Sequence, residues 1–500
     1  MKRLKTFTVW GIPLAITFTC LFSGCLKRHY PDVYENPETA LEIHQQEALS
    51  EAPFIPGEWP NTHWWRMFND CQLDTLMREA LSQNPDIKIA LARIRLASFA
   101  AQRAGAPLWP TLGLEADITR YRVSKTGAIA DLASRANSTT PVNPLPPPPL
   151  GPPGFTFTQT EINFNSQYTI DFWQQNLNSL KAAVGELLAT EADAAFSTVT
   201  LSISVAQAYF NLQTLYARQV VAQKRIDNRR EYLKLVNKRL KNGIDNELSL
   251  RTAESYVIGA EEAMKEIELS IAIYKNQLHA LLTGNFLEPI ASVSIDQHAL
   301  TPFPLPTNLP LGLLAHRPDV TATAWRVEEA ARNIKVARAA FYPNFNIMGL
   351  FGLQSIHPHE LFKWRSIYGQ AGPALNLPIF EGGLLQANLG VSHEQYYIAV
   401  EEYNKTIVRA VQDVLDGIAG LKYTFGELQD FNRIWELSNS NLNLTKKRFE
   451  HHIDSYLNVL DAELDAISKE DQKLIALGNY YIRFTNLISA LGGGYDTGCE

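Results

Sequence analysis

The chain has 500 residues, of which 46% are hydrophobic and 19% are charged, and its formal net charge is -7. This length exceeds one ordinary globular core, so the composition predicts several domains or one elongated architecture. The acidic balance offers no basic surface to a phosphate backbone, which excludes nucleic acid as an expected partner.

The N-terminus has the pattern of an export signal. Met1–Lys5 is basic, Phe7–Leu21 is mostly apolar, and Ser23 and Gly24 precede Cys25. The apolar run is too short for a comfortable membrane span. The small pair before Cys25 resembles a bacterial lipoprotein signal, so we expect residues 1–24 to be removed and Cys25 to carry a covalent lipid. An ordinary signal peptide with an incidental cysteine is the alternative.

The cysteines do not provide a disulfide framework. Cys20 would leave with the signal and Cys25 would carry lipid, which leaves Cys71 and Cys499 among the four. These two thiols can form one disulfide in an oxidising periplasm. Because sequence gives no distance between the two Cα atoms, the paired and the free forms both stay open.

Two stretches of the chain, 84–117 and 317–350, have the same plan at an offset of 233 (318 minus 85). Each begins with Pro-Asp, which favours a helix start because proline suits the first turn and the acid suits the positive end of the helix dipole. Each ends with an aromatic residue and a proline, Trp109-Pro110 and Tyr342-Pro343, and proline disfavours helix in the residue before it. The pattern predicts one helix in each stretch.

A strand with two different faces is expected over residues 161–172. One face is apolar and the other carries acids and amides, with Ser166 as the exception on the apolar face. The apolar positions, which we predict to face lipid, are Ile162, Phe164, Tyr168, Ile170 and Phe172. Residues 111–119 alternate in the same way, and 344–353 and 368–380 are the counterparts in the second copy. The pattern suits a transmembrane β-barrel, although a half-buried soluble sheet has the same period.

Four strands cannot close into a barrel, and an open edge in lipid leaves backbone groups unpaired. We therefore expect several chains to share one barrel. Eight strands from a dimer would be filled by side chains, whereas twelve from a trimer leave room for a lumen. The proline-rich segment 124–158 between the first two strands is expected to be a surface loop.

Long helices follow the strands. From Trp173 to Lys241 there is no proline and only Gly185 as a breaker, so a helix of about 69 residues would extend roughly 100 Å. Apolar residues recur there at alternating steps of four and three, and they recur again at an offset of 206. The aligned sets are Leu201, Val205, Ala208, Leu212 and Leu215, and Ile407, Val411, Val414, Ile418 and Leu421. This spacing predicts a coiled-coil seam.

A further repeat, at an offset of 209 (454 minus 245), pairs residues 238–254 with 447–463. The second copy contains His451 and His452, which raises the question of a metal site, an acid and base pair or a turn. Adjacent residues project about 100 degrees apart on a helix, which is poor geometry for one metal ion. We interpret both copies as turns of helical hairpins and predict no metal site.

No arrangement typical of catalysis is present. Gly492, Gly493 and Gly494 lack the lysine of a phosphate-binding loop, and Glu261-Glu262 has no histidine at helical spacing. No nucleophile accompanies a base. The sequence therefore predicts that the protein is not an enzyme and that it uses no cofactor beyond the lipid on Cys25.

In this order and in duplicate, these elements resemble the TolC-like outer membrane factors, particularly their lipoprotein branch. Further matching segments are 64–70, 73–94, 170–176, 377–385 and 490–496. The resemblance implies a mixed α+β membrane protein, a trimer with a twelve-strand β-barrel continued by an α-helical barrel. It also implies an equatorial belt and two internal repeats. The partners would be lipid of the outer membrane, a periplasmic membrane-fusion adaptor and an inner-membrane pump of the RND or ABC type.

The resemblance also assigns roles to residues of the two turns. Asp461 and Asn458 would form the pore constriction at the periplasmic tip, with one ring of three carboxylates because Asn458 is an amide. Residues of the first turn would dock the adaptor, namely Gly243, Ile244, Asp245, Leu248 and Ser249. His452 occupies the position equivalent to Gly243, which puts the geometry of the second turn in question and favours the first turn for docking.

The expected organisation has five parts. They are the signal at 1–24, an N-terminal segment at 25–72, a first repeat at 73–300 turning near 243, a second repeat at 301–491 turning near 453, and a tail at 492–500. The expected function is a passive outer membrane exit duct for efflux or secretion. The alternative is a lipid-anchored periplasmic coiled-coil adaptor or spacer that has the heptads but no barrel.

Overall fold

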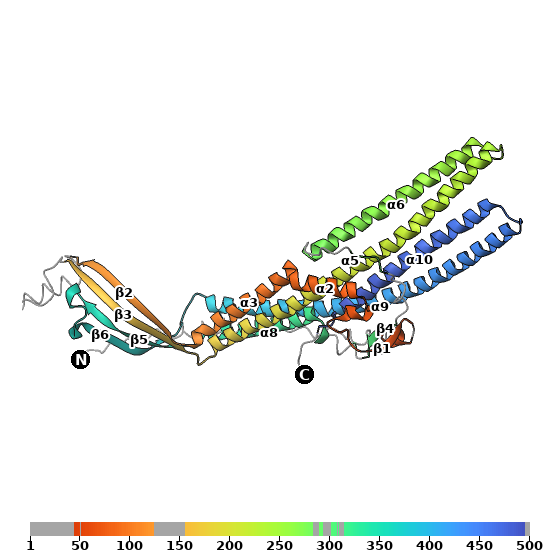
Figure 1. The fold of residues 1–500 in the computed structure, drawn as a ribbon. Coiled ribbons are helices and arrows are strands. Elements are labelled where there is room, and N and C mark those ends of the chain that lie inside the picture. The colour runs from red at the N-terminus through yellow and green to blue at the C-terminus, as the bar shows by residue number, and fades with distance from the viewer. Residues whose placement is uncertain are drawn as a thin grey trace, which may run out of the picture. The chain divides into compact units, whose positions relative to one another are not determined.

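The computed structural model describes residues 45–50, 52–124, 156–283, 290–293, 302–307, 309 and 315–495 (Figure 1). The predicted signal at 1–24, Cys25, Cys499 and most of the proline-rich loop lie outside the described residues. Among the residues that are described, none of the helices combines the length and apolar character needed to cross a membrane.

In the first half of the chain, short helices and strands come first and two long helices follow. It contains the short helices η1 (Trp64–Phe68), α2 (Cys71–Gln83), α3 (Pro85–Gly105) and η2 (Ala106–Leu108), the strands β1 (Phe54–Gly57), β2 (Thr111–Arg122) and β3 (Thr156–Ile170), and the long helices α5 (Gln175–Lys241) and α6 (Glu247–Leu281).

The second half has a similar order. It contains β4 (Phe303–Pro306), α8 (Pro318–Ala339), β5 (Asn344–Ser355), η4 (Pro358–Glu360), η5 (Trp364–Ser366), β6 (Ile367–Asn376), α9 (Leu384–Glu450) and α10 (Tyr456–Ala490). Helices α5 and α9 each have 67 residues, and α6 and α10 each have 35. The fold is thus mixed α and β, as the sequence predicted.

Local chemistry explains where the shorter helices begin. Asp70 accepts from the backbone N–H groups of Gln72 at 2.9 Å and Leu73 at 3.1 Å, which satisfies two of the unpaired donors of α2. Helices α3 and α8 carry proline in their first turn, where its missing N–H costs nothing. The two helices predicted from the Pro-Asp pairs are therefore confirmed.

The strands β2, β3, β5 and β6 form one antiparallel sheet in that order, and β1 pairs with β4 in parallel. The pairing of β2 with β3 runs without interruption from Thr111↔Gln167 to Arg122↔Thr156. Since side chains alternate along each strand, this register puts Leu112, Leu114, Phe164, Phe345 and Phe351 on one face of the sheet. The other face carries Glu115, Asn165, Gln167, Asn346 and Gln370.

Two predicted strand ends need correction. Phe172 was expected within the strand, but β3 ends at Ile170 and Phe172 packs edge-on against Phe345 beyond it. The last strand was expected to continue to residue 380, but β6 ends at Asn376. Pro378 follows closely, and proline cannot donate to a strand ladder.

The main core lies where η1 and α2 meet the long helices. Phe210 of α5 stacks on Tyr481 of α10 with ring centroids 4.7 Å apart, and Phe68 contacts both rings edge-on. The predicted seam of α5 is buried at all five positions, and on α9 Val414, Ile418 and Leu421 are buried. Ile407 and Val411 are partly buried against the same core. The coiled-coil spacing is confirmed as the packing face of these helices.

The long helices form two antiparallel hairpins, α5 with α6 and α9 with α10 (Figure 1). Polar contacts join α5 to α10. Arg218 donates to both carboxylate oxygens of Asp471 at 2.8 and 3.2 Å, Lys224 lies 2.8 Å from Glu470, and Asn228 donates to the backbone carbonyl of Leu460 at 2.9 Å.

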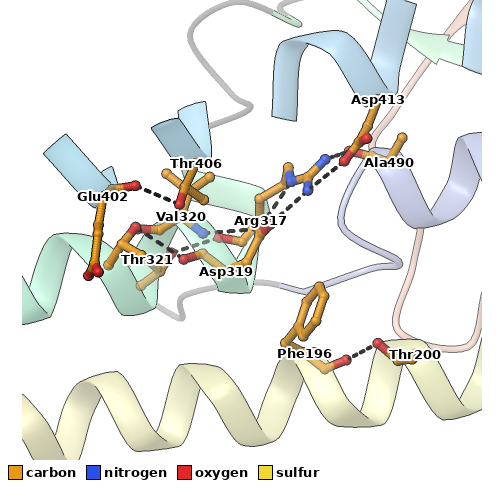
Figure 2. A network of polar contacts seen from close by, with 11 residues as sticks. Phe196, Thr200, Arg317, Asp319, Val320, Thr321, Glu402, Thr406, Asp413 and Ala490 are labelled. Carbon is orange, nitrogen blue, oxygen red and sulfur yellow. Dashed lines mark hydrogen bonds and ion pairs between the residues drawn. The ribbon is translucent and has the colours of Figure 1, made fainter. Parts of the chain in front are cut away.

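A buried arginine joins three further elements (Figure 2). Arg317, directly before α8, donates to both carboxylate oxygens of Asp319 at 3.0 and 2.7 Å. It also donates to Asp413 of α9 and to the backbone carbonyl of Ala490 of α10, each at 3.1 Å. These contacts hold the start of α8 against the middle of α9 and the end of α10.

Candidate functional site: two hairpin turns and a two-faced sheet

The first turn joins α5 to α6. Gly243 has a φ of 74°, the left-handed conformation that glycine adopts without a steric cost. The backbone N–H of Ile244 donates to the carbonyl of Arg239 at 2.9 Å, and the guanidinium of Arg239 lies 2.8 Å from Asp245. Asn246 then caps α6 by accepting from the N–H of Ser249 at 2.9 Å.

The second turn repeats this geometry. His452 has a φ of 59°, and the N–H of Ile453 donates to the carbonyl of Arg448 at 2.9 Å. Arg448 lies 3.1 Å from Asp454, and Ser455 caps α10. The replacement of glycine by histidine therefore leaves the turn unchanged. No group of three or more histidine, cysteine, aspartate or glutamate side chains among the described residues is placed to hold a metal ion.

The residues predicted to dock an adaptor differ in exposure. Ile244 is 62% exposed and Leu248 is 74% exposed, while Gly243 is also open to solvent. Asp245 and Ser249 are partly buried, because one pairs with Arg239 and the other lies at the cap of α6. The first turn thus presents an apolar pair on a backbone that hydrogen bonds hold in place.

The two residues predicted for the constriction are both exposed on α10. The amide of Asn458 donates to Asp454 of the turn. The structure leaves Asp461 close enough to Arg229 of α5 for its charge to act there. Partial burial lowers the pKa of Arg229, and the negative charge of Asp461 opposes that shift.

The aromatic neighbours of Asp461 were not predicted from the sequence. The guanidinium of Arg229 lies over the ring of Tyr256 at 4.7 Å and over that of Tyr232 at 5.7 Å. Burial raises the pKa of Tyr232, and the charge of Asp461 raises it further. The spacing of Arg229 and Tyr232, three residues apart on α5, was the available signal.

The two faces of the sheet differ in polarity. A hollow of 510 Å³ on one face is lined by the amides of Asn165, Gln167 and Gln370 together with apolar side chains such as Met348 and Leu350. The other face carries four of the residues predicted to face lipid, Ile162, Phe164, Tyr168 and Ile170. Neighbouring strands add exposed apolar side chains to it, Leu112, Leu114, Ile347 and Phe351 among them.

Aromatic side chains mark the passages between helices and strands. Trp109 precedes β2 and is 75% exposed, and Phe380 follows β6 and is 88% exposed. Trp173, after β3, stacks on Tyr342, before β5, with centroids 4.4 Å apart. The indole N–H of Trp173 donates to the carbonyl of Pro343 at 2.9 Å, so this pair is fixed in position.

Comparison with known proteins gives consistent matches. The family described as outer membrane efflux protein matches residues 76–284 and 309–493. The multidrug resistance outer membrane protein MdtP of Escherichia coli strain K12 is 26% identical over 482 residues, which is 96% of this chain and 95% of that protein.

Solved structures match as well. The outer membrane protein VceC of Vibrio cholerae is 29% identical with a TM-score of 0.73, covering 88% of this chain and 100% of that one. CusC is 25% identical with a TM-score of 0.75, covering 88% and 97%. The outer-membrane channel OprN, at 20% identity, has the same fold with a TM-score of 0.76 over 93% and 98% of the two chains.

Proposed function

The chain belongs to the outer membrane efflux protein family, and we propose that it is the outer membrane exit duct of a tripartite efflux system. It acts as a passive channel that receives its cargo from an inner-membrane pump through a periplasmic adaptor. The relatives named as multidrug resistance outer membrane proteins favour drugs as the cargo.

The observation that carries this proposal is the two-faced sheet. Among the strands that the structure describes, the outer two of this sheet, β2 and β6, each pair on one side only. An unpaired edge inside a bilayer is costly, so these edges must meet those of other copies. Three copies of a four-strand sheet make a barrel of twelve strands with the apolar face toward lipid and the amides toward a water-filled lumen.

The similar order and equal lengths of the helices in the two halves support two internal repeats. Each half then contributes one strand pair and one helical hairpin, so a trimer has six hairpins surrounding one axis. The aromatic residues at the passages between helices and strands suit the level of the lipid headgroups, where tryptophan and tyrosine are enriched. A lipid on Cys25 would provide a second attachment to the same membrane.

The turns would face the periplasmic partners. Asp461 from three copies would place three carboxylates around a narrow axis, which repels anions and retains cations. Asn458 would add amides one helical turn away. Gly243, Ile244 and Leu248 would give the adaptor an exposed apolar contact, with Asp245 and Ser249 fixing the turn that presents them.

The competing function is a lipid-anchored periplasmic spacer without a barrel. The coiled-coil seam fits both functions, but a spacer has no use for an exposed apolar sheet face. A closed barrel also resists detergent, so an oligomer band that survives on an unheated gel and disappears on heating favours the duct.

The decisive experiment is single-channel conductance of the purified protein in a planar bilayer. We expect small cation-selective openings from the wild type and larger ones from Asp461→Ala. Asp430→Ala, which removes an exposed carboxylate from α9, is the matched control and should behave as wild type. Absence of conductance from a stable folded oligomer would overturn the duct.

A further inference from the structure

The outward face of β2 changes from apolar to basic along its length. Leu112, Leu114 and Ile118 lie on this face, and the next two positions of the same alternation are Arg120 and Arg122. The register holds there without a bulge, since Arg120 pairs with Thr158 and Arg122 with Thr156. Both arginines are exposed. The apolar band therefore ends in cations at the end of the sheet that is farther from the helices.

The inward face at this end has the opposite charge. Asp117 lies directly across from Glu161, and Glu115 is two positions away on the same face. Two carboxylates directly opposite each other are unfavourable unless water or a cation is near. Positive and negative side chains are thus separated onto the two faces, so the cations cannot simply neutralise their acidic neighbours.

The loop between β5 and β6, residues 356–366, starts at the same end of the sheet, because Ser355 pairs with Thr160. Several of its polar groups are hydrogen-bonded within the loop. The hydroxyl of Ser366 donates to the carbonyl of Glu360 at 2.8 Å, and the N–H of Lys363 donates to that carbonyl at 2.9 Å. Leu361 is buried beneath. The loop is therefore a folded turn with its own hydrogen-bonded core.

This folded turn holds its largest side chains in the open. Trp364 is 88% exposed and Phe362 is 80% exposed, with Lys363 between them and Arg365 following. Lys363 pairs with Glu360 at 2.7 Å, an exposed contact that exchanges at little cost. Indole rings beside guanidinium and ammonium groups suit a boundary with an apolar side and a charged side.

We propose that this end of the sheet binds phosphate groups in the headgroups of the surrounding lipid. The binding surface, which we call the basic rim, consists of Arg120, Arg122, Lys363 and Arg365, with Phe362 and Trp364 at headgroup level. Guanidinium groups pair with phosphate through two parallel hydrogen bonds. The inference rests on the proposed membrane barrel, in which β6 of one copy adjoins β2 of the next and brings the two cation pairs together.

The test measures binding of bisphosphorylated lipid A to the purified protein in neutral detergent, with dephosphorylated lipid A and inorganic phosphate as separate ligands. We expect the wild type to prefer the bisphosphorylated lipid. The loop variant Lys363→Gln/Arg365→Gln and the strand variant Arg120→Gln/Arg122→Gln should each bind it roughly tenfold to thirtyfold more weakly, since one basic residue near an anionic lipid surface contributes about a factor of five.

The matched control is Arg251→Gln/Lys265→Gln, which removes two exposed cations from α6, 67% and 70% exposed in their side chains. It should bind as wild type. The loop variant changes no residue of a strand, so it keeps the test valid if the strand variant fails to fold. Unchanged binding by the loop variant, or equal binding of both lipids by wild type, would overturn the basic rim.

Inorganic phosphate is also tested as a competitor. If it displaced the bisphosphorylated lipid completely at a concentration equal to that of the lipid, the ligand would be phosphate itself and not a lipid. The proposed duct is tested separately. If the protein conducts ions but does not prefer the phosphorylated lipid, the basic rim alone is contradicted. If the oligomer is folded but does not conduct, the duct is contradicted.

Discussion

The same ion pair, arginine with aspartate, occurs in two very different regions of this molecule. At the start of α8, the side chain of Arg317 is 6% exposed and faces Asp319 and Asp413 (Figure 2). At the hairpin turns, the side chains of Arg239 and Arg448 are 32% and 59% exposed. Burial, more than distance, decides what each pair contributes to stability.

The environment of Arg317 explains the contrast. Burial alone would lower its pKa, but the two carboxylates outweigh burial and raise it. The charge therefore stays, and the cost of removing water is offset only while every partner is present. At the turns, water replaces a lost partner.

Arg317→Met should give the largest loss of stability, about 3–5 kcal/mol, because it leaves Asp319 with an uncompensated charge in a partly buried site. Native-state hydrogen exchange of α8, α9 and α10 in the detergent-solubilised oligomer measures this as a lower opening free energy. Arg433→Met, on the exposed surface of α9, is the control and should change little. A loss below about 1 kcal/mol would place Arg317 with the surface pairs.

Gly243→Ala should have the next largest effect and tests the turns themselves. Among the described residues, no atom beyond the two chain neighbours lies within 4 Å of a Cβ added at Gly243, so the cost is backbone strain, about 1–2 kcal/mol for a residue forced into the left-handed conformation. The reverse change, His452→Gly, relieves that strain but makes the unfolded chain more flexible, and the net effect should be near zero. Hydrogen exchange at the start of α6 and α10 measures both.

His452→Gly could instead stabilise the second turn as much as Gly243→Ala destabilises the first. In that case backbone strain alone would set the stability of both turns, and the flexibility of the unfolded chain would not contribute. If Gly243→Ala cost nothing, the glycine would serve another purpose, such as contact with a partner.

Much of the fold was predictable because apolar residues recur at simple intervals along its helices and strands. Spacing along the chain is enough to predict the Pro-Asp helix starts, the heptad seam and the two-faced strands. The structure has a helix or a strand at each of these positions. The left-handed conformation of His452 also follows from the repeat, since its turn has the same ion pair and cap as the first. Taken alone, the histidine at position 452, where the first turn has glycine, would have suggested a different turn geometry.

Other features depend on contacts between distant residues, which spacing does not reveal. Arg317 joins residues 96 and 173 positions away, and Arg229 lies near Asp461 of another helix. Phe172 packs against Phe345 of another strand, beyond the end of β3 at Ile170. The sorting of cations and acids at the far end of the sheet required the strand register.

Glu329→Gln addresses a third electrostatic case, a pair of like charges. Burial, the negative charge of Glu186 and a hydrogen bond with Glu186 raise the pKa of Glu329, while Asn333 and Arg326 oppose that shift. A raised pKa means that the stability this group contributes is complete below its unfolded pKa and is lost as pH rises through the folded one. Both carboxyl groups are partly exposed, so the effect should be smaller than that of backbone strain.

The measurement is the temperature at which the oligomer dissociates, followed across pH. Wild type should lose stability as the pH rises above the ordinary glutamate range, and Glu329→Gln, which is always neutral, should give a flatter profile. Glu262→Gln, an exposed change on α6, should leave the wild-type profile intact. Parallel profiles for wild type and Glu329→Gln would contradict the raised pKa of Glu329.

The smallest effects should come from the arginines of the two turns. Arg239→Gln should cost more than Arg448→Gln, because Arg239 meets both oxygens of Asp245, at 2.8 and 3.3 Å, and is less exposed. Both losses should be small and should shrink further at high salt, since exposed ion pairs are screened. Hydrogen exchange at the turns in low and high salt measures this difference. A loss at either turn that equals that of Arg317→Met would show that the backbone geometry of the turn, and not solvent exposure, sets the strength of the pair.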